Sequence, residues 1–212
     1  MRTIALSILI CLLACQSNKM NNNQTHPYIV VLGIAQDAGY PQANCNKQCC
    51  QKAWKNKNLT KYVSCIALVD PVSKQQWLFD ATPDIKFQLQ ELEKTTNVNP
   101  INGIFLTHAH IGHYVGLLQL GREVMGTQNM PVYAMEKMHK FLKNNAPWNQ
   151  LIKIKNININ TISNNNSVQL NERITVTPFL VPHRDEYSET VGYKINTDDK
   201  SLIFIPDIDK WE

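Results

Sequence analysis

Residues 101–113 read Ile101-Asn102-Gly103-Ile104-Phe105-Leu106-Thr107-His108-Ala109-His110-Ile111-Gly112-His113. The apolar first half is typical of a buried strand, and three histidines begin where that strand should end. Neutral imidazole is a good ligand for zinc, iron or nickel, and histidines two apart at a strand end can point into one cavity. The third histidine is expected to open the next helix. We therefore predict a transition-metal site here, with unrelated surface histidines as the alternative.

Two later segments have the same form, an apolar strand followed by a residue that can bind metal. Residues 174–181 precede His183, which lies 70 residues after His113 (183 − 113). Residues 201–206 precede Asp207, 24 residues after His183 (207 − 183). The repeated form predicts that strand ends bring these side chains to one site. A loop position for His183, and a turn or cap position for Asp207, are the alternatives.

This pattern resembles the metallo-β-lactamase superfamily, whose hallmark is His-x-His-x-Asp-His at the end of a strand. The resemblance implies an α/β fold of the αββα sandwich type. It also implies that His108, His110 and His183 hold a first metal, while His113 and a bridging Asp207 face a second and take part in catalysis.

Gly112 departs from the pattern, because the superfamily has an aspartate there that binds the second metal and handles a proton. A glycine can do neither. Asp185, Glu186 and Asp37 are the nearby carboxylates that we consider as substitute proton handlers.

A stretch near the N-terminus indicates one branch of this superfamily. It reads Val30-Val31-Leu32-Gly33-Ile34-Ala35-Gln36-Asp37-Ala38-Gly39-Tyr40-Pro41-Gln42, with Asn44-Cys45 after it. It is similar to the branch that contains the pyrroloquinoline quinone biosynthesis protein B and the cyclic phosphodiesterase of phosphonate breakdown. That branch implies a structural zinc bound by a cysteine cluster. Here the candidate ligands are Cys45, Cys49 and Cys50, with a spacing that differs from the Cys-x-Cys-x-x-Cys of the relatives. A disulfide among these three is the alternative. Cys65 is expected to pack as a small apolar residue.

The resemblance also leads us to expect that the fold is incomplete at its C-terminus. The last metal ligand of the superfamily, and the fourth zinc ligand of the branch, are histidines located beyond the equivalent of Asp207. This sequence ends at Glu212, five residues past Asp207 (212 − 207).

The N-terminus predicts export. Met1-Arg2 is followed by an apolar core from Ile4 to Ala14, which is too short for a membrane-spanning helix and typical of a signal peptide. Leu12-Leu13-Ala14-Cys15 resembles a bacterial lipoprotein cleavage box, so we predict a signal peptide over 1–15 with lipidated Cys15. A polar tether over 16–27 and a domain over 28–212 would follow, on a lipid-anchored protein of the cell envelope. A buried N-terminal helix is the alternative.

The remaining patterns predict a mixture of strands and helices, and the charge argues against nucleic acid as a partner. Strands are expected at 28–35, 62–69, 76–80, 131–134 and 153–160, and helices at 84–92, after His113, and at 135–142. The net charge of +4 is modest and scattered, so nucleic acid is not an expected partner.

Together these features predict a metal-dependent hydrolase of a small-molecule substrate, with one or two zinc ions at the histidines. A metal-bound hydroxide would attack a phosphodiester, or a carboxyl-type ester, lactone or amide. Two alternatives stay open. The quinone-biosynthesis resemblance implies a metal oxidoreductase that uses iron, and Gly112 is compatible with a binding lipoprotein that has lost turnover.

Overall fold

The structure is a computed structural model that describes residues 24–211. The predicted signal peptide, the lipidation site Cys15 and the first part of the predicted tether lie outside the described residues. Among the described residues, no helix combines the length and the apolar character that a membrane span needs.

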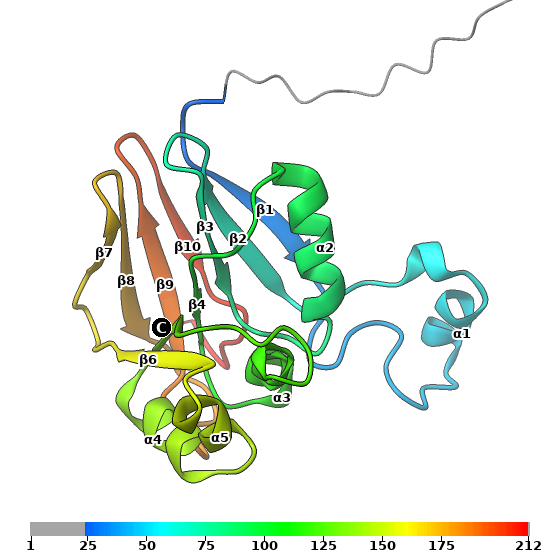
Figure 1. The fold of residues 1–212 in the computed structure, drawn as a ribbon. Helices are drawn as coiled ribbons and strands as arrows, with labels where there is room; N and C mark the ends of the chain where they lie inside the picture. Colours follow the sequence, from blue (N-terminus) through cyan, green and yellow to red (C-terminus); the bar gives the residue numbers. More distant parts are fainter. Residues whose placement is uncertain (1–23, 212) are drawn as a thin grey trace, which may run out of the picture.

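The first half of the domain forms a six-stranded sheet in the order β1-β2-β3-β4-β5-β6 (Figure 1). The first three strands pair antiparallel, and β3 to β6 pair parallel. Residues of β2 and β4 are buried on both faces, which explains their continuous apolar sequences. The strands are β1 (Tyr28–Gly33), β2 (Cys65–Asp70), β3 (Gln75–Phe79), β4 (Gly103–Phe105), β5 (Met130–Ala134) and β6 (Ile157–Thr161).

The second half forms a four-stranded antiparallel sheet in the order β10-β9-β8-β7. Buried and partly exposed residues alternate along β8, as expected for a strand with one face on the core. The strands are β7 (Val168–Asn171), β8 (Ile174–Leu180), β9 (Val191–Asn196) and β10 (Ser201–Phe204).

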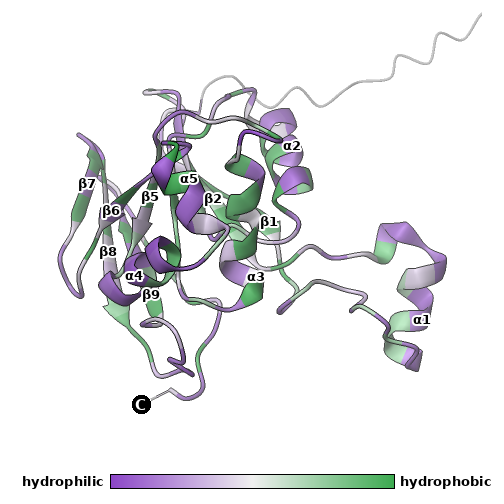
Figure 2. Ribbon diagram, turned by 60° about the horizontal axis from the view of Figure 1, so that its bottom comes forward, coloured by the Kyte–Doolittle hydropathy of each residue, from purple (hydrophilic) through white to green (hydrophobic). Residues whose placement is uncertain are grey.

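Helices cover one side of the six-stranded sheet, where they share a buried cluster with its strands. In α2, Ile85, Gln88 and Leu92 recur at helical spacing and are buried, and Figure 2 shows hydrophobic and hydrophilic residues mixed along this helix. The helix ends at Thr96, and the next residue, Asn97, has the left-handed conformation that is typical after a helix. The helices on this side are α2 (Ile85–Thr96), α3 (Ile111–Tyr114), the 3-10 helix Val115–Leu120, α4 (Glu136–Asn144) and α5 (Trp148–Lys153).

A second buried cluster lies between the two sheets. Its centre is aromatic, with the rings of Phe79 and Phe105 stacked at 5.0 Å and the ring of Tyr193 packed edge-on against both at 5.4 Å. Within residues 24–211, strands and their adjoining loops supply this cluster, and no helix contributes to it. The predicted α/β sandwich is therefore confirmed in its two sheets, with a helical layer seen on the six-stranded sheet.

Several predicted boundaries were wrong. The predicted strand at 153–160 begins only at Ile157. Lys153 is the last residue of α5, and Lys155 has a positive φ of 59°, which is not compatible with an extended strand. The strand predicted from Tyr62 begins at Cys65, because Val63 instead forms a bridge with Ala35. Neither β7 nor the helices α1 (Gln48–Lys55) and Lys57–Leu59 was expected.

Candidate metal centre

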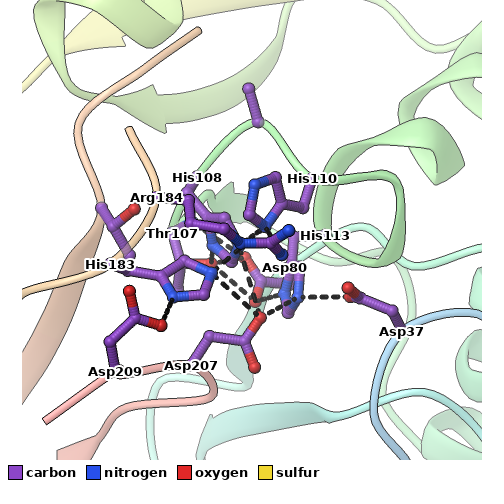
Figure 3. A network of polar contacts seen from close by, with 12 residues as sticks. Asp37, Asp80, Thr107, His108, His110, His113, His183, Arg184, Asp207 and Asp209 are labelled. Carbon is purple, nitrogen blue, oxygen red and sulfur yellow. Dashed lines mark hydrogen bonds and ion pairs between the residues drawn. The ribbon is translucent and has the colours of Figure 1, made fainter. Parts of the chain in front are cut away.

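Four predicted ligands come together where strands of the two sheets end (Figure 3). His108 and His110 follow β4, His183 follows β8, and Asp207 follows β10. The Nδ1 atom of His110 lies 2.9 Å from His108 Nε2 and 3.2 Å from His183 Nε2. Asp207 Oδ2 lies 3.4 Å from His108 Nε2 and 3.9 Å from His183 Nε2. One ligand atom from each residue lies within 4.8 Å of all the others. We call these four residues the first cluster.

Outer carboxylates set the orientation of two of these imidazoles. Asp209 Oδ1 lies 2.7 Å from His183 Nδ1, and Glu186 Oε2 lies 3.0 Å from His110 Nε2. An ionised carboxylate can only accept, so each of these ring nitrogens donates its hydrogen outward. In the neutral imidazole, the opposite nitrogen then presents a lone pair to the centre of the cluster.

A different contact orients His108. The hydroxyl of Thr107 donates its single hydrogen to the buried carboxylate of Asp80, at 2.9 and 3.0 Å from the two oxygens. It can therefore only accept from His108 Nδ1, 3.0 Å away, which leaves the Nε2 lone pair of His108 facing the cluster. Burial lowers the pKa of His108, which favours the neutral ring.

Three imidazole lone pairs and a carboxylate oxygen therefore converge on one point. Such atoms repel one another unless a cation lies between them. The donor set of three nitrogens and one oxygen is that of a zinc or iron site. The residues of the first cluster thus fit a divalent metal ion, and metal binding by each individual residue stays a prediction.

A second cluster of ligand-type residues shares Asp207 with the first and consists of Asp37, His113 and Asp207. His113 is buried in α3, which begins at Ile111 rather than at His113 as predicted. Its Nε2 atom lies 3.1 Å from Asp37 Oδ1 and 3.2 Å from Asp207 Oδ2. Its Nδ1 atom lies 2.7 Å from Asp80 Oδ2, so the outward hydrogen of His113 goes to Asp80.

The charges in the second cluster are strongly coupled. Burial alone would lower the pKa of His113, but the carboxylates of Asp80, Asp207 and Asp37 outweigh it and raise that pKa to about 11. The nearby imidazoles of His108 and His113 hold the pKa of Asp207 far below its usual range, and the hydrogen bond with His113 lowers the pKa of Asp37. Three carboxylates lie around one imidazole here, an arrangement that favours a cation.

The three carboxylates considered for proton handling have separate positions. Asp185 accepts a hydrogen bond from Thr190 Oγ1 at 2.9 Å and belongs to neither cluster. Glu186 contacts His110 on its outer side, and Asp37 reaches His113 directly. Sequence reasoning missed the roles of Asp80 and Asp209. Asp80 follows directly after β3, so the rule that led to His183 and Asp207 would also have found it.

The cysteines lie apart from the histidines, on the α1 segment that extends from the body of the domain (Figure 1). Ligand atoms of Cys45, Cys49 and Cys50 lie within 4.8 Å of one another, and all cysteines of the described residues are free. Hydrogen bonding between the thiols lowers the pKa of Cys45 and raises that of Cys50 to about 11. Three thiols this close suit a zinc ion with one further ligand, which stays a prediction. Cys65 is fully buried, as expected.

Comparisons with known proteins agree with the fold. Residues 75–212 match the family model of the β-lactamase superfamily domain. Coenzyme PQQ synthesis protein B of Methylorubrum extorquens (strain PA1) is 28% identical over 199 residues, which cover 84% of this chain and 64% of that protein. The chain thus spans less than two thirds of the length of this curated relative.

Two solved structures are similar to the model. The Zn(2+)-bound PqqB from Methylobacterium extorquens has a TM-score of 0.74 at 26% identity, covering 87% of this chain and 66% of the other. A diphosphatase from the PhnP family has a TM-score of 0.60 at 21% identity, covering 80% and 62%, and this likeness concerns the fold alone. The chain therefore belongs to the β-lactamase superfamily, and its relatives place it beside the PqqB-like branch.

Proposed function

We propose that this protein is a metal-dependent hydrolase. The observation that carries the proposal is the convergence of three imidazoles and Asp207, beside a second cluster that shares Asp207. We further propose zinc as the metal, since the donor set suits it and a similar PqqB structure is described as Zn(2+)-bound.

The residues of the chain have separable tasks in this proposal. His108, His110 and His183 would hold the first ion, and Asp207 would lie between the two ions. When bound, zinc acidifies a water molecule and polarises the bond to be cleaved. Asp209 fixes the ring of His183, so that the nitrogen facing the cluster stays available as a ligand.

Arg184 supports an anionic substrate. Its side chain is directed toward the first cluster, with Nη2 3.5 Å from His110 Nδ1 (Figure 3). A guanidinium matches the geometry of phosphate oxygens and is always charged. Phosphodiesters and diphosphates are therefore the first substrates to test, followed by lactones, esters and amides.

The test is a hydrolysis screen with the zinc-loaded chain, beside a His110→Ala variant as the control. Turnover of a phosphodiester or diphosphate by the wild type, lost in the variant, is expected. A wild type that binds metal but cleaves none of these classes would overturn the proposal and favour a binding protein.

A second candidate function has its own support. Coenzyme PQQ synthesis protein B is similar over 84% of this chain, so an oxidoreductase role in quinone-cofactor synthesis is the alternative proposal. Three imidazoles also suit iron. Purification with iron instead of zinc, and oxygen uptake with a quinone precursor, would favour it over hydrolysis.

We also propose that Cys15 carries a lipid anchor that holds the protein on a membrane of the cell envelope, on the sequence pattern of residues 1–15. Fractionation of cells that produce the wild type or a Cys15→Ser variant tests this. The wild type should be in the membrane fraction and the variant should leave it. Equal distribution of both proteins would contradict the anchor.

A further inference from the structure

Asp37 occupies the space that a side chain at position 112 would need. A Cβ atom built on Gly112 would lie 2.4 Å from Asp37 Oδ1, 3.2 Å from Asp37 Cα and 3.4 Å from Asp37 Cγ. The close contact involves the carboxylate, and the next involves the backbone of the loop. A side chain at 112 and the present position of Asp37 therefore exclude each other.

The loop that carries Asp37 is held on both sides. Before it, Ala35 N donates to Tyr62 O at 2.9 Å, and after it, Tyr40 N donates to Lys61 O at 3.0 Å. Between them, Gly39 N donates to Gln36 O at 3.0 Å, which closes a turn over Asp37. The positive φ of Gly39, 83°, suits glycine at the end of this turn. The backbone thus fixes where the carboxylate of Asp37 lies.

The carboxylate of Asp37 points toward His113 (Figure 3). Its Oδ1 atom lies 3.1 Å from the nitrogen of His113 that faces Asp207. Because Asp80 takes the other hydrogen of His113, the second cluster presents an imidazole nitrogen and two carboxylates to one place.

We propose that Asp37 replaces the aspartate that the superfamily pattern has at position 112, and binds the second metal ion together with His113 and Asp207. The ligand types are the same, but the carboxylate comes from a turn 76 residues before His113 (113 − 37). In this arrangement, a glycine at 112 leaves the space that the Asp37 carboxylate occupies. Gly112 then does not mean that the second metal site has been lost. The inference rests on the metal centre of the proposed function.

The test is a Co²⁺ titration of the full chain, followed by absorbance, because thiolate-bound cobalt absorbs strongly in the near ultraviolet and marks the cysteine site separately. Asp37→Asn keeps the shape of the side chain and removes its charge. We expect Asp37→Asn to lower the affinity of the second cluster for its ion by about 100-fold or more and to leave the first ion bound. Asp185→Asn, a nearby carboxylate outside both clusters, should bind both ions like the wild type.

A rescue variant makes the test sharper. Asp37→Ala should lose the second ion, and Asp37→Ala/Gly112→Asp should regain it, because the new carboxylate takes the vacated space. Gly112→Asp alone should bind the second ion less tightly than the wild type, because two side chains compete for one space. Circular dichroism checks that each variant is folded.

Unchanged binding of the second ion by Asp37→Asn would overturn the inference. So would loss of both ions in Asp37→Asn while Asp185→Asn retains them, since Asp37 would then support the whole site. Hydrolysis by the wild type is measured separately, so a protein that binds two ions but cleaves nothing refutes the proposed function and leaves the assignment of Asp37 standing.

Discussion

The two ligand clusters share Asp207 but are built differently. In the first cluster, three imidazoles follow the ends of strands, and burial lowers the pKa of His108. In the second cluster, the imidazole of His113 comes from a helix, and Asp37 comes from a turn with its side chain 39% exposed. The first is a nitrogen-rich site at the ends of strands, and the second is a carboxylate-rich site completed by a loop.

This difference predicts that the clusters hold their ions with different strength. Three nitrogen donors favour tight binding of zinc, whereas carboxylates suit a wider range of divalent ions. The second ion is therefore expected to leave first when metal is withdrawn with a chelator.

The largest effect is expected from His110→Ala. It removes a donor from the centre of the first cluster, so the first ion should be lost and hydrolysis should fall below detection. Elemental analysis and turnover measure this. Metal content equal to that of the wild type would contradict the assignment of the first cluster.

A matched pair of variants separates the two clusters. Asp80→Asn should lower the affinity for the second ion, and Asp209→Asn the affinity for the first ion, by about 10- to 100-fold each. The reason is that each carboxylate accepts the outward hydrogen of one ligating imidazole. Asp80 is fully buried and also accepts from Thr107, which orients His108, so its variant should have the larger effect and should also weaken binding of the first ion to a smaller extent. Metal titration of both variants checks this, and equal weakening of both ions in each would show that the clusters act as one unit.

A smaller effect is expected on the substrate side of the first cluster. Arg184→Gln should raise KM for a phosphodiester by about tenfold, the size of one charged hydrogen bond, and should leave kcat within a few fold. Steady-state kinetics measure this, with a neutral lactone as the control substrate. The same rise in KM for both substrates would argue against recognition of charge.

The smallest effect concerns the core beneath the first cluster. The hydroxyl of the buried Tyr193 donates to the carbonyl of Leu106, two residues before His108, and burial holds its pKa well above 10. Since the folded state favours the neutral phenol, its contribution to stability is complete below about pH 10 and is lost as pH rises further.

Tyr193→Phe should therefore cost about 1 kcal/mol of unfolding free energy at neutral pH and should flatten the fall in stability above pH 10. Urea unfolding at several pH values tests this. Part of the alkaline slope should remain, because burial also raises the pKa of Cys65 well above its ordinary value. Identical slopes in both proteins would refute the role of Tyr193.

Sequence reasoning found the first cluster because its ligands obey a local rule, that of a buried strand followed by a ligand-type residue. His108, His110, His183 and Asp207 all follow that rule, and the structure brings them together. The resemblance to the superfamily supplied their order along the chain.

The same reasoning could not assign the second cluster. Asp37 reaches His113 because the loop after β1 is hydrogen-bonded to residues 61–64. A local sequence pattern cannot predict a contact between segments that are this far apart in the chain. Gly112 was therefore interpreted as a missing ligand. The error at residues 153–156 has a simpler cause, since alternating lysine, isoleucine and asparagine resemble a strand pattern where the chain ends α5 and turns.

Anomalous X-ray diffraction from crystals of the full chain soaked with zinc tests the two-cluster centre most directly. We predict two peaks beside Asp207, one among His108, His110 and His183, and one between His113 and Asp37. A single peak at the three histidines, with Asp37 turned away from the metal, would contradict the account.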